Sequence, residues 1–110
     1  MAYDQKLASR IRAILRDRPG VAERPMFGGL SFMLGGNMAC GVIGDDVMVR
    51  VGPAAFDDAV NRPHARVMDF TGKPARGAVY VAPAGVATDA DLAEWVELGA
   101  AYARSLPRKA

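Results

Sequence analysis

The segment 26–52 constrains the fold more than any other part of the chain, because it is rich in β-forming residues and interrupted at intervals by glycine. It contains three apolar runs separated by two short turns: the runs are 27–34, 38–43 and 47–51, and the turns are Gly35-Gly36-Asn37 and Gly44-Asp45-Asp46. Both turns supply the residues that adopt the positive φ angles of tight hairpins. The segment therefore predicts a meander of three antiparallel strands.

The last of these runs also predicts how the sheet is covered. Val47, Val49 and Val51 alternate with Met48 and Arg50. Alternation with a period of two is typical of a strand with one buried face and one face that is partly exposed to water.

Helical periodicity frames the β segment at both ends of the chain. Residues 3–18 carry an apolar stripe at helical spacing that ends at Pro19-Gly20; the stripe consists of Tyr3, Leu7, Ile11, Ile14 and Leu15. Near the C-terminus, Thr88 and Asp91 form an acidic variant of the capping box. They open a helix that Pro107 closes, with an apolar side made of Leu92, Trp95, Val96, Gly99, Tyr102, Ala103 and Leu106.

The middle of the chain completes the element order. Gly52-Pro53 opens a short helix, with Phe56 and Val60 facing inward, that ends at Arg62-Pro63. Two further strands are predicted at 66–70 and 78–82. The order α-β-β-β-α-β-β-α predicts a single α+β domain over residues 1–110, with an antiparallel sheet of about five strands flanked by helices.

Composition limits the class of protein. A chain of 110 residues has room for one core, and its net charge of +2 is too small to indicate a nucleic-acid partner. Its single cysteine allows no intramolecular disulfide, which fits a reducing compartment. Charged residues such as Asp4 and Lys6 interrupt any signal peptide, and the glycine turn at 35–37 breaks the longest uncharged stretch. We expect a cytoplasmic protein with no membrane contact.

The sequence shows no constellation of residues typical of catalysis or metal binding. His64 is the only histidine and follows the short helix in an expected exposed loop, with no nucleophile near it in sequence. Zinc needs about four Cys or His ligands at short spacing, and the chain has one of each. Cys40 lies in an apolar run and is expected to be a small core residue. We expect no catalytic residues, metal or cofactor.

One stretch is a candidate recognition surface for a protein partner. Arg24, Met26 and Phe27 stand at the entry to a strand, beside the glycine pair Gly28-Gly29. Together with Phe70 they are the candidate partner-binding residues. The alternative is that Met26 and Phe27 only anchor the strand, while the glycine pair allows a bulge or a close backbone approach.

Two further surfaces leave alternatives open. Lys6, Arg12 and Arg16 form a basic face on the first helix, with Arg10 and Arg18 nearby, which is the best but weak signal of a nucleic-acid interface. Charges on the outer face of an amphipathic helix are usually just solvated. On the last helix, Leu98 widens the apolar arc near Tyr102. This edge is either ordinary core or the contact of a homodimer.

Four segments together resemble a known family: they are Arg24-Pro25-Met26-Phe27-Gly28-Gly29-Leu30-Ser31-Phe32, Met48-Val49-Arg50-Val51-Gly52, Asp69-Phe70-Thr71-Gly72-Lys73-Pro74, and the helix from Trp95-Val96 to Ala103-Arg104-Ser105-Leu106-Pro107. The chain resembles the N-terminal domain of the TfoX/Sxy family of bacterial regulators over nearly its whole length. The resemblance implies an α+β domain similar to secretion-chaperone-like folds, without enzymatic activity. The family provides no agreed set of functional residues.

Longer members of that family are associated with competence-gene regulation and assist a cyclic-AMP-responsive activator through protein contacts. They carry a second, C-terminal helical domain, for which these 110 residues leave no place, so we expect a stand-alone N-terminal-like domain. The leading hypothesis is a non-enzymatic regulator that acts through protein–protein contacts, with a homodimer expected. The alternatives are a nucleic-acid-binding module that uses the first helix, and a small-molecule or minor catalytic module near Phe27 and Phe70.

Overall fold

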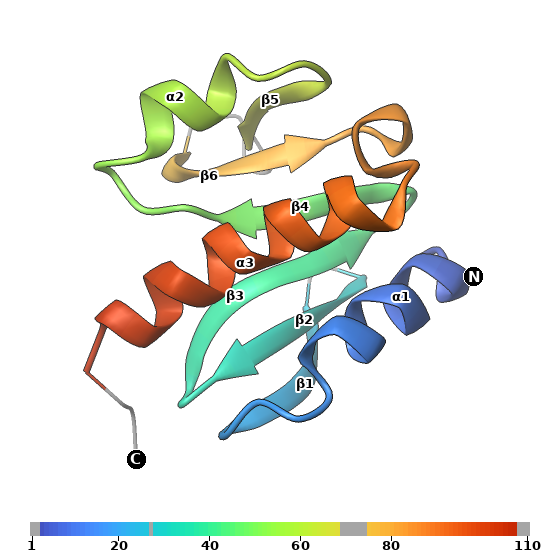
Figure 1. Ribbon diagram of the computed structural model, residues 1–110, viewed down its shortest axis with the longest axis vertical. Coiled ribbons are helices and arrows are strands. Elements are labelled where there is room, and N and C mark those ends of the chain that lie inside the picture. The colour runs from blue at the N-terminus through green and yellow to red at the C-terminus, as the bar shows by residue number, and fades with distance from the viewer. Residues whose placement is uncertain (1–2, 27, 69–74, 108–110) are drawn as a thin grey trace.

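The computed structural model describes residues 3–26, 28–68 and 75–107. Its elements follow in the order α1 (Gln5–Leu15), β1 (Val21–Met26), β2 (Gly29–Leu34), β3 (Asn37–Ile43), β4 (Asp46–Arg50), α2 (Phe56–Val60), β5 (Ala65–Met68), β6 (Ala75–Val81), the 3-10 turn η1 (Pro83–Val86) and α3 (Asp89–Ser105) (Figure 1). The predicted α+β class is confirmed.

All strand pairs are antiparallel, and the sheet order is β1-β2-β3-β4-β6-β5. The first four strands form a meander. The chain then passes through α2 to β5 at the far edge and returns as β6, which lies between β5 and β4 (Figure 1). This arrangement makes β1 and β5 the two edge strands.

The sheet has six strands where the sequence predicts about five, because the segment 21–26 is a separate strand. Gly28 adopts a φ of 77°, and Met26 pairs with Gly29 across the resulting hairpin. Residues 22–25 are all exposed. An exposed edge strand has no alternation of apolar and polar side chains, so its sequence carries no signal of that kind.

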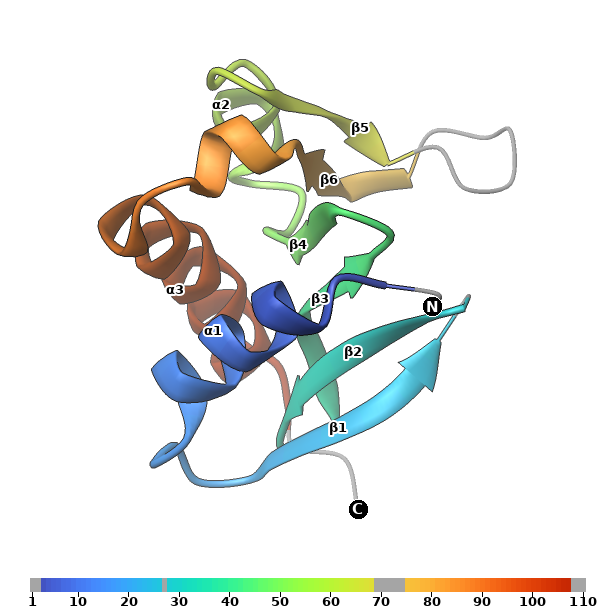
Figure 2. The ribbon, with the colours of Figure 1, turned by 90° about the vertical axis from the view of Figure 1, so that its right-hand side faces the viewer.

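The described helices all lie on one side of the sheet (Figure 2). The longest of them, α3, lies across β3 and β4, with α1 beside it. Gly99 permits this close approach, because a Cβ at that position would overlap the carbonyl oxygen of Ala39 on β3.

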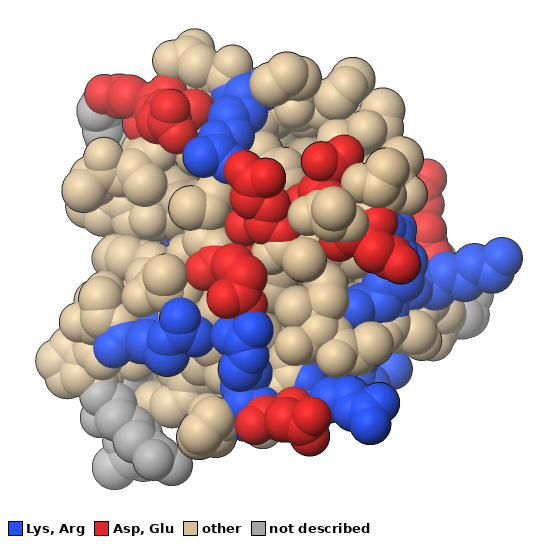
Figure 3. Space-filling model, in the orientation of Figure 1, with Lys and Arg blue, Asp and Glu red and all other residues tan. Residues whose placement is uncertain are grey.

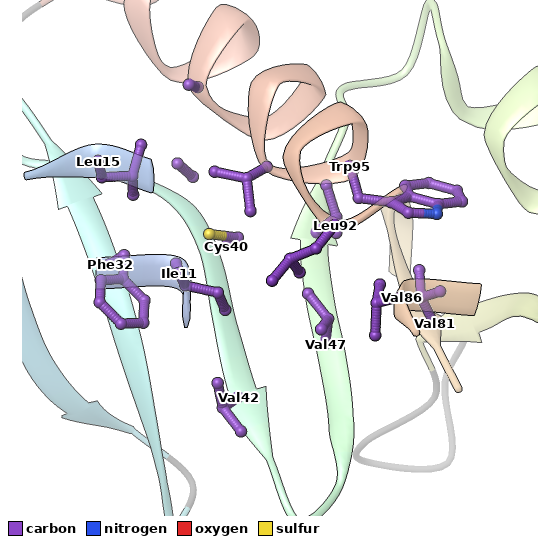
Figure 4. Close-up of a cluster of buried hydrophobic side chains, with 14 of the residues drawn as sticks. Ile11, Leu15, Phe32, Cys40, Val42, Val47, Val81, Val86, Leu92 and Trp95 are labelled. Carbon is purple, nitrogen blue, oxygen red and sulfur yellow. The ribbon is translucent and has the colours of Figure 1, made fainter. Parts of the chain in front are cut away.

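The core lies between the helices and the sheet (Figure 4). The predicted stripe of the first helix is confirmed at Leu7, Ile11 and Leu15, which are buried, and the placement of Trp95 in the core is confirmed by its 5% exposure. Cys40 is fully buried among these apolar side chains, as its sequence context predicts. Burial of apolar surface of this kind is the main stabilising contribution to such a domain.

Side-chain caps fix where the helices start. The Asp4 carboxylate accepts hydrogen bonds from the backbone N–H groups of Lys6 and Leu7, at 2.9 and 3.1 Å, so α1 starts at Gln5 and is shorter than the predicted 3–18. At α3, the Thr88 hydroxyl oxygen accepts from the N–H of Asp91 at 3.1 Å, which confirms the predicted cap.

Candidate functional site

The side of the sheet opposite the helices carries a surface that the described helices do not cover (Figure 2). Because side chains alternate along each strand, the strand register identifies the residues on this side. The exposed and half-buried side chains of this surface, called the open face below, are Ala22, Arg24, Met33, Met38, Ile43, Asp46, Arg50, Arg66 and Tyr80.

A small apolar cluster forms the centre of the open face. Met48 and Ala78 are buried, and Met38, Ile43 and Tyr80 are half-buried and pack against them. This confirms the predicted alternation in β4, with the difference that Met48 is fully buried, because its neighbours on the open face cover it. Methionine side chains are flexible and polarisable, and they adapt readily to different apolar partners.

A hollow of about 330 Å³ lies beside this cluster, at the end of the sheet formed by β1, β2 and β3. Its lining consists of Arg24, Pro25, Ser31, Met33, Gly36, Met38 and Arg50. The Ser31 hydroxyl, which is buried, donates a hydrogen bond to the carbonyl oxygen of Arg24 at 3.1 Å. This bond ties β1 to β2 at the point where Arg24 enters the lining.

The arginines of the hollow differ from most others in the molecule. Six arginines have a carboxylate oxygen within 4.0 Å: Arg10, Arg12, Arg16, Arg18, Arg62 and Arg66. Among the side chains that the structure describes, Arg24, Arg50 and Arg104 have no such partner. Two of these three arginines line the same hollow.

The positive charge of the open face is therefore uneven. Arg66 is neutralised by Asp46 at 2.6 Å and lies over the ring of Tyr80, 4.9 Å from its centroid. Arg50 instead lies over the ring of Tyr102, at 5.3 Å, which holds the guanidinium without cancelling its charge. Among the described residues of the open face, the arginines without a carboxylate partner, Arg24 and Arg50, both lie at the hollow.

Arg24 is the one predicted partner-binding residue whose side chain the structure places. It is exposed and lies on the open face. Met26 lies at the end of β1, but its side chain, Phe27 and Phe70 lie outside the described part of the chain. Sequence reasoning did not identify Arg50 as a second arginine beside Arg24 in the hollow. The alternation in β4 had nevertheless assigned Arg50 to the partly exposed face of the sheet.

The two predicted dimer-interface residues are both half-buried. Leu98 packs against the main core. The ring of Tyr102 lies against Gly52, where a φ of 84° and the ring itself leave no space for a side chain. Tyr102 thus makes extensive contacts within its own chain.

The basic face predicted on the first helix is interleaved with acidic groups (Figure 3). Arg12 donates two hydrogen bonds to the Glu23 carboxylate, at 2.6 and 2.8 Å. This pairing raises the pKa of Arg12 and lowers the pKa of Glu23. Arg16 lies 4.0 Å from Asp17, while Lys6 has no carboxylate within that distance in the described residues.

A second hollow, of about 350 Å³, lies between the start of α3 and the loop before β5, and its charged groups are largely satisfied within the chain. Arg62 lies over the ring of Trp95 and pairs with Asp58 at 3.2 Å and Glu94 at 3.0 Å. His64, on its rim, is exposed, as its sequence position predicts, and occupies a turn with a φ of 68°.

Two observations concern metal ligands and the cysteine thiol in the described residues. These residues contain no group of three or more His, Cys, Asp or Glu side chains arranged to hold a metal ion. Burial raises the pKa of the Cys40 thiol to about 12, so the thiol stays protonated at neutral pH and is a poor nucleophile. No helix in the described ranges is long and apolar enough to cross a membrane.

These features define a small α+β domain with the described helices on one face of its sheet and an uncovered surface on the other. The chain belongs to the TfoX N-terminal domain family, whose family model matches residues 13–103. A search of curated proteins and a search of solved structures each found no match.

Proposed function

We propose that this protein is a non-enzymatic bacterial regulator that acts by binding a partner protein on the open face. One observation carries the proposal: Arg24 and Arg50 line a hollow with Met33 and Met38, and neither arginine has a carboxylate partner among the described residues. Met33 and Met38 are half-buried, and partly exposed apolar side chains beside unpaired arginines are typical of protein interfaces. Membership of a family linked to competence regulation supports a role connected to transcription, in the cytoplasm.

The two edge strands of the sheet are poorly suited to pairing with a strand of another protein, which leaves the open face as the more suitable binding surface. The edge strand β1 carries Glu23, Arg24 and Pro25, and proline has no N–H group to donate to an added strand. The other edge strand, β5, has only four residues. Charges, proline and short length all discourage the addition of a strand from another chain.

The alternatives have weaker support. Arg12 of the first helix is engaged by Glu23, which leaves less free charge for nucleic-acid phosphates. A small-molecule or catalytic site near Phe27 and Phe70 falls outside the described residues. A homodimer through Leu98 and Tyr102 on α3 remains part of the proposal, and it adjoins the open face where the Tyr102 ring contacts Arg50.

Transcript profiling in the native host tests the regulatory role. Deletion of the gene is expected to change a defined set of transcripts, and the wild-type gene to restore them. A variant with Met33→Gln and Met38→Gln removes the apolar character of the hollow at similar side-chain length and is expected not to restore them. The control is Ala101→Gln, at an exposed position on α3. Unchanged transcripts in the deletion strain, or full restoration by the methionine variant, would overturn the proposal.

A further inference from the structure

We infer that the partner segment bound at the hollow is acidic and carries apolar side chains, so that its carboxylates meet Arg24 and Arg50 while an apolar side chain enters between Met33 and Met38. The inference rests on the proposed function and specifies the chemistry of the partner. It commits to a segment of another protein as the occupant.

Charge complementarity carries the first step. Most arginines in the described part of the chain are matched by a carboxylate of the same molecule, whereas the two at the hollow are not. A guanidinium is planar and presents paired donors that fit a carboxylate in bidentate geometry. Arg24 and Arg50 therefore provide two carboxylate sites at the rim of one hollow.

The lining of the hollow carries the second step. Pro25, Met33 and Met38 contribute apolar surface to the lining. Met33 on β2 and Met38 on β3 belong to the two strands between those that carry the arginines. A purely polar acidic chain would leave this surface exposed to water, whereas a segment with apolar side chains would cover it. The contact of Arg50 with the Tyr102 ring reduces the freedom that Arg50 would lose on binding.

The charges also argue against a second copy of this chain as the occupant. In a two-fold contact the same surface meets itself, so the open face would have to supply the carboxylates for its own arginines. Asp46, the carboxylate of the open face among the described residues, is already engaged by Arg66. The helical side carries acidic residues on α2 and α3, but a contact between that side and the open face joins unlike surfaces and does not close into a two-fold dimer.

The test measures the binding of short fluorescent peptides by anisotropy. The main probe is a peptide of repeating Asp-Leu-Glu triplets; the controls are an Asp-Ser-Glu repeat, a Lys-Leu-Arg repeat and a random-sequence DNA duplex. The protein variants are Arg24→Glu and Arg50→Glu, with Arg104→Glu as the matched control, because Arg104 also has no carboxylate partner in the described residues but lines a different hollow. Circular dichroism of each variant checks folding.

We expect saturable binding of the Asp-Leu-Glu peptide, weakened about tenfold by either open-face variant and less than about twofold by Arg104→Glu. Three results would overturn the inference: no saturable binding of that peptide, equal binding of the Asp-Ser-Glu peptide, or tighter binding of the duplex or the basic peptide with loss in the same variants. If the peptide assay fails in one of these ways, the acidic–apolar partner is wrong, and transcript profiling still tests the proposed regulatory function independently. Conversely, peptide binding without any change in transcripts would overturn the regulatory function but would support the hollow as a binding site.

Discussion

The guanidinium of Arg50 lies over the ring of Tyr102, with its central carbon 5.3 Å from the ring centroid. Arg50 ends β4, and Tyr102 lies near the C-terminal end of α3, so this contact links the open face to the longest helix. Cation–π contacts hold a guanidinium in place and leave its charge available to a further partner. Tyr102 is therefore a positioning residue for Arg50.

Removal of the Tyr102 ring should destabilise the domain. Tyr102→Ala loses the contacts with Gly52 and Arg50 and is expected to lower the free energy of unfolding by about 2 kcal/mol. Tyr102→Phe keeps the ring and should cost less than about 0.5 kcal/mol. Urea titrations followed by circular dichroism measure both values. Equal stability of the alanine variant and the wild type would show that the ring contributes nothing.

The core position of Trp95 predicts a larger effect. Trp95→Ala is expected to cost about 3–5 kcal/mol, because the side chain is 5% exposed and its removal leaves a cavity beneath Arg62. A loss of this size is a large part of the stability of a small domain. A denaturant titration that shows a loss below about 1 kcal/mol would contradict this placement.

Cys40 should make stability fall at alkaline pH. The pKa of its thiol is about 12 in the folded chain, against about 8.5 for a free thiol, so the unfolded chain loses this proton first. The contribution of the buried, protonated thiol to the free energy of unfolding is fully present below about pH 8. It is lost as the pH rises towards 12, at up to about 1.4 kcal/mol per pH unit.

Urea titrations between about pH 8 and pH 11 test this dependence against Cys40→Ala. Other groups that titrate in this range are common to both proteins and cancel in the difference. The gap between the two unfolding free energies should therefore narrow as the pH rises. A gap that stays constant over this range would show that the thiol is not shielded.

Self-association is predicted from the sequence. Tyr102 contacts Gly52 and Arg50 of its own chain, and these contacts do not test whether it also contacts a second chain. A two-fold dimer through the edge of α3 at Leu98 and Tyr102 should give a mass of about twice 11.7 kDa by light scattering on a sizing column. Leu98→Lys should convert it to a monomer, while Ala101→Lys, on an exposed part of the same helix, should not. A monomeric wild type at tens of micromolar would exclude a stable dimer.

The helices could be predicted from sequence because their signals are local. The capping pair Thr88 and Asp91 and the apolar stripe of the first helix both lie within a few turns of chain. The strand β1 could not be predicted in the same way, since an edge strand with exposed Glu23, Arg24 and Pro25 has no periodic pattern. Its existence depends on pairing with β2.

The candidate site could be predicted only in part, because it also depends on contacts between strands that are distant in the sequence. Arg24 is conspicuous in sequence, and the alternation in β4 places Arg50 on the partly exposed side of the sheet. That these two arginines line one hollow depends on the order of four strands and on the register between them. The absence of a carboxylate partner among the described residues depends likewise on tertiary contacts, which local spacing does not encode.

Site-specific photocrosslinking in the native host tests most directly whether the open face binds a partner protein. A photoreactive amino acid replaces Met33 on the open face in one variant and Glu94 on the helical side in the other, followed by mass spectrometry of the crosslinked species. We predict a discrete crosslink to another protein from position 33 and none to that protein from position 94. The same partner crosslinked from position 94 alone, or no crosslink from position 33 in a folded and expressed variant, would contradict the account.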